Sequence, residues 1–279
     1  MAYSQRIAND DFIMEIYVDP FNKRIRVDDY RGNVLKMIEK AEELVSVLQV
    51  EKLIVLGRKE DFTSFLENGF LSEAVVERFF RGSDAYYFTK YFSEKRMQSR
   101  QWMKEDTILK NVGALTRNPV TITVPEEYNL IKINKADAEN LAKLYKKIFQ
   151  IYPVPLHEPE YIRKTMEHGT IYYAYLLHGT IVSAASAEVN DLYFNAELTD
   201  CATLSEHRKF GLMKKLLMKL EADLVKQGIF CAYSIARARS FGMNAVLQQL
   251  GFRYRGRLLN NCYISQELEN MNMWVKELS

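Results

Sequence analysis

Apolar and polar positions along the chain switch several times between a two-residue and a helical period, which predicts alternating strands and helices. Residues 11–30 alternate on both sides of Asp19-Pro20 and predict two strands joined by a tight turn, so that a hairpin opens the chain. Apolar residues at 34, 35, 38, 41, 44, 45 and 48 form a helical stripe, and KLIVLG predicts a buried strand. A short helix ending at Gly69 and the strand-like segments EAVVERFF and DAYYFTKYF complete an α/β unit.

The pattern blurs from 93 to about 128, where a charged, helix-like segment is followed by Pro119 and Pro125. A domain boundary is expected there. We predict an N-terminal α/β domain over residues 1–125 and a second domain over 126–279. The second domain reads β-α-α-β-β-β-α-β-α-β-β, with helices expected over 136–150 and 159–168.

One short pattern occurs in both predicted domains. SFLENGF at 64–70 and VLQQLGF at 246–252 each follow a strand and belong to a short helix, and each precedes two strand-like segments. Gly69 and Gly251 suit left-handed caps at the ends of these helices. Two interpretations remain: the N-terminal domain is a diverged half-repeat, or a Gly-Phe ending is simply a common way to end a helix.

Composition narrows the choice of partners. The 279 residues are 48% apolar and 27% charged, as in soluble globular proteins. The 38 basic residues nearly balance the 36 acidic ones, so no global field favours nucleic acid or a membrane. No window approaches the ~18 apolar residues of a membrane span, and we predict a cytoplasmic protein. The expected partner is a small molecule bound at a local site.

Cysteine and histidine spacing predicts neither a disulfide nor a metal site. Cys201, Cys231 and Cys262 are odd in number and lie far apart in strand-like sequence, which favours reduced structural thiols. The four histidines form no ligand spacing with each other or with cysteine; they are His157, His168, His178 and His207.

The stretch 201–228 carries the first chemical signal. It begins as a strand, turns at Arg208-Lys209-Phe210-Gly211, and continues as a helix with an apolar stripe. A helix N-terminus offers unpaired N–H groups and partial positive charge, and Gly211 lets a phosphate approach closely. Strand-to-helix turns also contain glycine for packing reasons, so a phosphate site and a packing turn both fit the pattern.

Residues 128–279 resemble the GNAT superfamily of acyl-CoA-dependent N-acetyltransferases. Its motif Arg/Gln-x-x-Gly-x-Gly/Ala matches at Arg208 and Gly211 and departs at Met213, whose side chain must then point into the helix packing. The resemblance implies an α/β (α+β) fold with a mixed central sheet flanked by helices, and acetyl-CoA as co-substrate. The implied cofactor-binding residues are Ala202, Thr203, Leu204, Arg208, Lys209, Phe210, Gly211, Leu212, Met213, Ser240 and Asn244.

Two of these residues come from RARSFGMNAVLQQLGF, which is similar to the next superfamily element. Ser240 stands in the position that often holds a CoA-contacting asparagine, and Asn244 is either a polar contact from the same helix or a helix-surface residue. Leu247 stands where the superfamily often has a tyrosine acid. Leucine cannot donate a proton, so water, Tyr254 or Tyr263 would protonate the leaving thiolate.

Further segments resemble the β-lysine N6-acetyltransferase family. They are AELTDCATLSEHRKFGLM, RSFGMN, LLNNCYIS, LENMNMWVK and YPVPLHEPEYI, with ENGF and RGSDAYYFTKYFSEKR in the first half. The resemblance implies acetylation of the side-chain amine of β-lysine to Nε-acetyl-β-lysine, a compatible solute used in osmoadaptation. Alternatives are a protein or polyamine acetyltransferase and a non-catalytic acyl-CoA-binding module. A homodimer is possible.

Carboxylates within apolar strands are the candidate catalytic groups. An alkyl ammonium with a pKa of about 10.4 must lose a proton before it can attack a thioester. We expect Glu197 to act as base or to position water, and Asp200 or Glu188 to anchor the ammonium; salt bridges are the alternative. Strict alternation places Glu197 and Asp200 on opposite faces, although a bulge would break this parity.

Candidate acceptor contacts come from two other segments. Tyr152 and His157 lie in a Pro-rich loop that either closes over the acceptor or is a rigid connector. Asn260, Asn261 and Ser265 either bind the amino-acid head group or cap sheet edges. Backbone N–H groups of 202–204 would stabilise the thioester oxygen. We expect direct transfer without an acyl-cysteine intermediate.

Overall fold

The computed structural model describes residues 2–117, 123–149, 152–264 and 267–278. The first half contains β1 (Tyr3–Ala8), β2 (Phe12–Asp19), β3 (Arg24–Gly32), α1 (Val34–Leu48), β4 (Lys52–Gly57), η1 (Lys59–Asp61), α2 (Phe62–Glu67), β5 (Leu71–Phe80), β6 (Ser83–Tyr91), α3 (Glu94–Met97) and α4 (Trp102–Gly113). The second half contains β7 (Tyr128–Lys132), η2 (Lys135–Asp137), α5 (Ala138–Ile148), α6 (Pro159–Glu167), β8 (Ile171–Leu177), β9 (Thr180–Asn190), β10 (Asn195–Thr203), η3 (Ser205–Phe210), α7 (Leu212–Lys226), β11 (Cys231–Arg237), α8 (Phe241–Gln249), β12 (Arg253–Ile264) and β13 (Glu267–Glu277).

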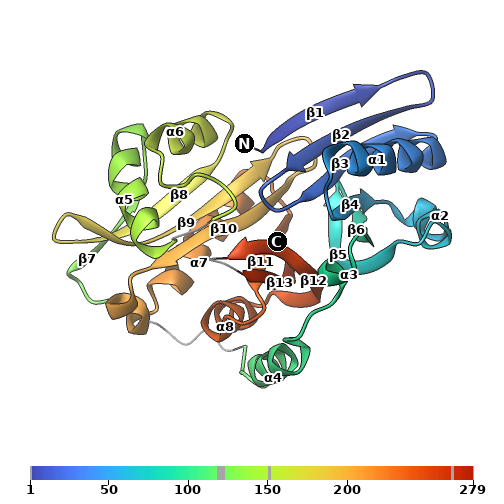
Figure 1. Ribbon diagram of the computed structural model, residues 1–279. Helices are drawn as coiled ribbons and strands as arrows, with labels where there is room; N and C mark the ends of the chain where they lie inside the picture. The colour runs from blue at the N-terminus through green and yellow to red at the C-terminus, as the bar shows by residue number, and fades with distance from the viewer. Residues whose placement is uncertain (1, 118–122, 150–151, 265–266, 279) are drawn as a thin grey trace.

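The strands in the described residues form one mixed sheet, in the order β1-β2-β3-β4-β6-β5-β12-β13-β11-β10-β9-β8-β7 (Figure 1). The pairs β3–β4 and β10–β11 are parallel, and each is connected through a helix, α1 or α7. Parallel neighbours need such a crossover because a tight turn can join only antiparallel strands. The mixed sheet expected from the sequence is therefore present.

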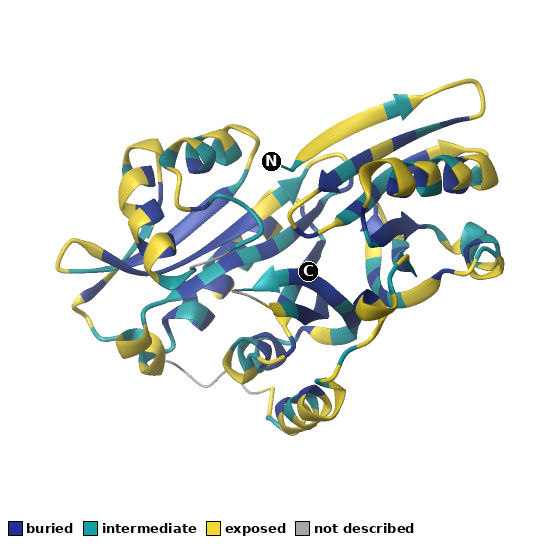
Figure 2. Cartoon of the chain, viewed as in Figure 1, coloured by how far each residue is buried: buried dark blue, intermediate teal, exposed yellow. Residues whose placement is uncertain are grey.

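The N-terminal elements follow from the sequence pattern, with one exception. The stripe on α1 buries Met37, Ile38, Ala41 and Val45, and Figure 2 shows the outer side of this helix exposed. Strands β2 and β3 form the predicted hairpin, but the sequence did not predict β1, which precedes them and pairs antiparallel with β2. The sequence YSQRIA gave no signal because β1 is an edge strand with largely exposed side chains.

The second half has the order of elements predicted from the sequence. Helices α5 and α6 cover one face of β8–β10, and α7 covers the other face (Figure 1). Leu216, Leu217, Leu220 and Leu224 of α7 are fully buried against that second face. No helix among the residues that the structure describes is both long and apolar enough to cross a membrane.

The two halves share one topology. The sheet order β2-β3-β4-β6-β5 with α1 and α2 matches β9-β10-β11-β13-β12 with α7 and α8. Gly69 and Gly251 have φ values of 80° and 89°, and the following Phe70 and Phe252 are both buried. A shared helix ending alone would not produce the same strand order. The structure therefore favours the half-repeat interpretation.

The two halves meet edge to edge at β5 and β12, where Gly256 pairs with Ala74. One face of each half-sheet contributes to a common apolar cluster, which includes Ile54 from β4 and Met273 and Val275 from β13. Helix α4 packs against α8 and buries Val112 in the core of the second half. The boundary predicted at 125/126 falls between α4 and β7 and stays a prediction.

Gly256→Ala is expected to destabilise the protein at this joint. A Cβ at Gly256 would lie 2.1 Å from the Glu73 carbonyl oxygen and 2.5 Å from the Ala74 Cα, and its φ of 137° already disfavours other residues. A strained backbone position costs about 1–3 kcal/mol before any clash is added. Thermal denaturation should show a clear loss of Tm, whereas Gly242→Ala in α8, where a Cβ meets open space, should show none. An unchanged Tm for Gly256→Ala would contradict the tight joint.

Candidate active site

Strands β10 and β11 run side by side only over their first residues. The pairs are Asn195–Cys231, Ala196–Ala232 and Glu197–Tyr233, and no later pair joins the two strands in the described residues. Strand β10 nevertheless continues to Thr203. The edge of β10 that faces β11 is therefore open beyond Glu197, and an extended ligand can pair with it there.

A β-bulge turns Asp200 toward the side of the sheet that carries Glu197. The register with β9 shifts between Thr199 and Ala202, and Asp200 has a φ of 52°. Leu198 packs on the α7 side, whereas Ala202 packs with α5 and α6. The expectation from strict alternation, opposite faces for Glu197 and Asp200, is thus wrong, because the extra residue of a bulge inverts the alternation that follows it.

Glu188, Glu197 and Asp200 form what we call the acidic cluster. Glu188 and Glu197 are direct neighbours across β9 and β10. The Asp200 carboxylate accepts hydrogen bonds from Ser186 Oγ at 2.8 Å and from the Tyr152 hydroxyl at 3.1 Å. These contacts bring together on one face all three carboxylates that the sequence singled out.

Burial raises the pKa values of all three carboxylates, and repulsion from Glu188 adds to the shift in two of them. Desolvation, followed by repulsion from Glu188, raises the pKa of Glu197 to about 8. The same two causes raise the pKa of Asp200 to about 7. Desolvation also raises the pKa of Glu188, although this residue keeps an exposed surface. Protein atoms thus surround the cluster while water still reaches it, and an arriving cation would restore the charged forms.

Tyrosines surround the acidic cluster. Burial and then the Asp200 charge raise the pKa values of Tyr145, Tyr152 and Tyr172, so that all three remain protonated hydrogen-bond donors. Burial, followed by the Glu188 charge, also raises the pKa of Tyr161 from α6. The Tyr152 ring stacks on Phe149 with centroids 4.3 Å apart. The Pro-rich loop thereby places a phenol hydroxyl directly on a cluster carboxylate.

The other predicted acceptor contacts lie elsewhere. His157 is exposed, with its Nε2 atom 3.9 Å from Glu158. Asn260 is buried and donates from Nδ2 to the carbonyl oxygens of Arg96 and Gln98, at 2.8 Å each. Asn261 is buried and its carbonyl oxygen accepts from Arg24 at 3.1 Å. Ser265 lies outside the described residues. Contacts of these residues with an acceptor stay predictions.

The turn before α7 has the features of an anion site. Gly211 has a φ of 68° and begins α7 without any side-chain cap, and the first turn of the helix has no acidic residue. Arg208 and Lys209 are exposed beside it. In the first half, by contrast, the equivalent helix α1 is capped by Asn33, which accepts from the Lys36 N–H at 3.1 Å. Of these two equivalent helix N-termini, the one at α7 is open to a phosphate.

The remaining predicted cofactor residues near this turn are placed as follows. Met213 packs against the core of the second half, as its departure from the motif requires, and Leu212 is buried. The Leu204 N–H donates to the Val182 carbonyl at 3.0 Å, so this amide is already engaged within the protein. Thr203 bonds Ser183 through the side chain at 2.7 Å, and the Phe210 ring packs on Tyr128. Ala202 is buried at the bulge.

Ser240 and Asn244 have defined contacts within the protein. Ser240 caps α8 by accepting from the Met243 N–H at 3.4 Å. Asn244 is fully buried; its amide donates to the carbonyls of Arg237 and Ser240, and its oxygen accepts from Asn272 and Trp274. Asn244 would have to give up one of these bonds to contact acetyl-CoA. Roles of both residues in cofactor binding stay predictions.

Cys201→Ala is expected to retain most activity. Burial, followed by the Asp200 charge, holds the pKa of the Cys201 thiol well above its usual range, which disfavours the nucleophilic thiolate. Cys201, Cys231 and Cys262 are all free thiols in the structure. Steady-state CoA release and intact-protein mass spectrometry would test the prediction. Acetyl trapped on Cys201 of the wild type would contradict direct transfer.

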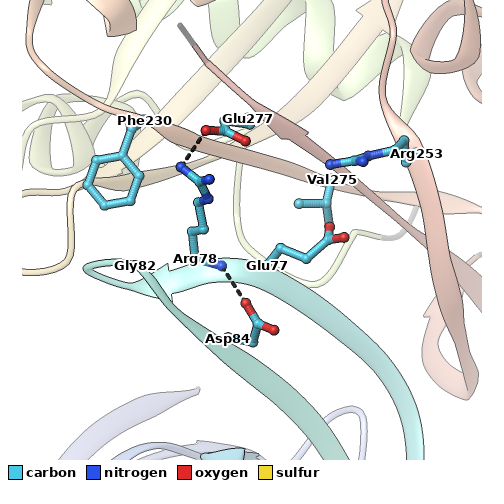
Figure 3. A pocket seen from close by; sticks show the side chains of 8 residues that line it. All are labelled: Glu77, Arg78, Gly82, Asp84, Phe230, Arg253, Val275 and Glu277. Atoms are coloured by element: carbon cyan, nitrogen blue, oxygen red, sulfur yellow. Dashed lines mark hydrogen bonds and ion pairs between the residues drawn. The ribbon is translucent and has the colours of Figure 1, made fainter.

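A pocket at the joint of the two halves does not overlap the acidic cluster (Figure 3). Its lining residues are Glu77, Arg78, Gly82, Asp84, Phe230, Arg253, Val275 and Glu277. It adjoins the amino end of β11, whereas β10 and β11 part toward their carboxyl ends. Arg78 pairs with Glu277, and Arg255 pairs with Glu77. Two of the three acids that line the pocket, Glu77 and Glu277, thus pair with arginines, and the third, Asp84, accepts from the Arg78 backbone N–H at 2.9 Å.

The sequence did not identify the residues that the first half brings to the acidic cluster. Burial raises the pKa values of Glu188 and Glu197, and the nearby charge of Arg26 from β3 opposes both shifts. Burial also raises the pKa of Tyr17 from β2, and the charges of Asp19 and Glu188 add to that shift. Burial raises the pKa of Tyr87 from β6 and, within the second half, that of Tyr233 from β11, and the Glu197 charge adds to both shifts. The half-repeat was the signal that could have identified Arg26, because its strand β3 is the counterpart of β10, which carries Glu197.

Comparisons with known proteins agree with this geometry. The model of the Acetyltransferase (GNAT) family matches residues 138–252, which include the bulged strand, the open turn and α7. These residues therefore form a GNAT acetyltransferase domain, and the fold class expected from the sequence is confirmed. No group of three or more side chains suited to a metal ion occurs within the described ranges.

Relatives that match over almost their whole length narrow the assignment. The N-acetyltransferase YodP of Bacillus subtilis is 38% identical over 260 residues, covering 93% of this chain and 94% of the relative. The Beta-lysine N(6)-acetyltransferase of Methanococcus maripaludis is 34% identical, covering 94% of this chain and 95% of the relative. That of Methanosarcina mazei is 32% identical, covering 90% of this chain and 100% of the relative. The chain belongs to the β-lysine N6-acetyltransferase family.

Proposed function

We propose that this N-acetyltransferase moves the acetyl group of acetyl-CoA to the N6 amine of β-lysine. The observation that carries the proposal is the acidic cluster beside the open edge of β10, with the α7 N-terminus beyond it. The names of two relatives support the acceptor. Three carboxylates within a ring of tyrosines suit a ligand with two ammonium groups.

Acetyl-CoA fits the remaining features as co-substrate. The N–H groups at the start of α7 and the Arg208 and Lys209 side chains would bind its pyrophosphate. Its pantetheine arm would pair with the open edge of β10 and bring the thioester to the bulge. No side chain of this chain needs to carry the acetyl group in such a ternary complex.

The reaction removes one proton from the ammonium before attack and a second from the same nitrogen as the amide forms, and it returns one proton to the leaving thiolate. The ammonium of the acceptor binds Asp200 or Glu188, and Glu197 accepts its proton directly or through water. The free amine attacks the thioester carbon, and the C–S bond breaks as the amide forms. A thiolate with a pKa of about 8.5 leaves with little help. Tyr254 packs on Trp274 and Tyr263 on Phe21, and either of them or water would protonate it.

Acetyl-CoA turnover against a panel of amines tests the proposal. The panel contains β-lysine, lysine, ornithine and polyamines, with mass spectrometry to locate the acetyl group. We expect the highest kcat/KM for β-lysine and acetylation at N6. Preference for a polyamine or a peptide would leave the chemistry in place and overturn the acceptor. CoA release that no amine stimulates would overturn the enzyme assignment.

We further propose that the product serves as a compatible solute. Acetylation removes one positive charge from β-lysine and leaves a zwitterion of zero net charge near neutral pH. Such a molecule can accumulate without attracting counter-ions. Deleting the gene should abolish Nε-acetyl-β-lysine and slow growth at high salt, and externally added product should restore growth. Normal salt tolerance in the deletion strain would contradict this role.

A further inference from the structure

Two rows of side chains face each other where the half-sheets pack together. In the second half, Glu188, Glu197, Tyr233 and Val275 are successive neighbours across β9, β10, β11 and β13. In the first half, Tyr17, Arg26 and Ile54 are successive neighbours across β2, β3 and β4. Ile54, Tyr233 and Val275 belong to the same apolar cluster. The polar ends of both rows therefore lie on one side of that cluster.

Arg26 and Glu197 occupy equivalent positions in the two half-repeats. Each stands in the third pair of its parallel ladder, Arg26 opposite Ile54 and Glu197 opposite Tyr233. Each strand also changes register soon afterwards, between Val27 and Asp29 in β3 and between Thr199 and Ala202 in β10. The repeat thus places a cation where its partner half has the proposed base.

Direct contacts hold β3 over the acidic cluster. The Tyr193 hydroxyl, in the turn between β9 and β10, donates to Asp29 Oδ2 at 2.6 Å. The Asn195 side chain donates to the Phe79 carbonyl at 2.8 Å, and the Phe79 ring lies 5.7 Å from the ring of Tyr233. These contacts join the first half to residues of β10, of the turn before it and of β11, all of which are close to Glu197.

Arg26 keeps hydrogen-bonding capacity for a ligand. Its Nε and Nη2 atoms donate to the Asp28 carboxylate, and its guanidinium lies 5.4 Å from the ring centre of Tyr17. Nη1, with two further N–H donors, has no protein acceptor among the described residues. The side chain is 33% exposed, so solvent and ligands reach it. A guanidinium held in this way is suited to recognising a carboxylate.

We propose that Arg26, contributed by the first half, binds the carboxylate of the amino-acid acceptor while the acidic cluster binds its ammonium groups. The inference rests on the proposed function, because it assigns a residue to the acceptor site of that reaction. A site lined only by carboxylates would repel an amino-acid carboxylate and would favour simple diamines. Arg26 would reverse that preference, which makes the first half a determinant of specificity.

A pair of acceptors that differ only in the carboxylate tests the proposal. Pentane-1,4-diamine is β-lysine without its carboxyl group. Arg26→Gln should lower kcat/KM for β-lysine roughly 10- to 150-fold, as expected for a lost charged hydrogen bond, mainly through KM. The same variant should retain diamine acetylation, which shows that it is folded. Arg26→Lys should lie between the two, because it keeps the charge and loses the guanidinium that Asp28 holds in place.

The control is Arg6→Gln, which removes an exposed arginine from the outer strand β1 and should change neither rate. A wild-type enzyme inactive on β-lysine would overturn the proposed function and this inference with it. A wild-type enzyme active on β-lysine, with an Arg26→Gln variant that keeps the same ratio of β-lysine to diamine turnover, would overturn the inference alone.

Discussion

Glu197→Gln is expected to lower kcat by about 10²- to 10⁴-fold with a much smaller change in KM, the usual loss when a general base is removed. Glutamine keeps the size of the side chain and its place on β10 but cannot accept the ammonium proton. The acid limb of the wild-type pH–rate profile should reflect the raised pKa of the cluster, with activity rising as Glu197 deprotonates toward pH 8. The variant should lack this limb.

Stability provides a second readout for the same change. The folded-state pKa of Glu197, about 8, lies above its ordinary value of 4.5. A raised carboxyl pKa contributes stability that is fully present below pH 4.5 and is lost as pH rises through 8. Without acceptor, Glu197→Gln should therefore lose less Tm than the wild type between pH 6 and 9. The matched control is Glu15→Gln on β2, an exposed strand glutamate. A variant with normal kcat would assign proton removal to another group.

Gly211→Glu is expected to weaken acetyl-CoA binding by at least about 10²-fold, because it combines backbone strain with a like charge beside the pyrophosphate. Gly211 has a φ of 68°, which favours glycine, and its position starts α7 without any cap. Gly211 is only partly buried and the preceding Arg208 and Lys209 are exposed, so the fold should survive the change. Calorimetric titration with acetyl-CoA, together with Tm, measures both effects.

Two companion variants separate strain from charge. Gly211→Ala introduces strain alone and should give an intermediate loss of affinity. Gln227→Glu adds the same charge at the exposed far end of α7, where the helix carbonyls lie, and should leave binding intact. Equal affinities for Gly211→Glu and the wild type would place acetyl-CoA elsewhere on the protein.

The sequence predicted local structure well because most of it is decided by local patterns. The stripe on α1, the strand KLIVLG and the order of elements after residue 126 are all present. The exposed strand β1 escaped notice because an edge strand buries few side chains. The sheet face on which Asp200 lies could not be predicted either, because the apolar and polar alternation that precedes a bulge does not show where the bulge will occur.

The candidate site was predictable only in the half that carries its motifs. Glu188, Glu197 and Asp200 stood out as carboxylates within apolar strands, and the turn at Gly211 stood out by its spacing. Arg26 did not stand out, because it is 171 residues from Glu197 and its charge acts on Glu197 only through the packing of one half-sheet on the other. Contacts at such separations depend on tertiary structure rather than on local periodicity.

The shared topology of the halves has a consequence for how such a site can evolve. If two identical chains packed in the same way, each would present the same residue at this position, and glutamate would face glutamate. Fusing two copies in one gene releases them from that constraint. One copy can then have a capped helix N-terminus, like that of α1, and can carry arginine at position 26 where the other copy carries glutamate. Duplication would in this way have converted a redundant catalytic unit into an asymmetric receptor for the acceptor.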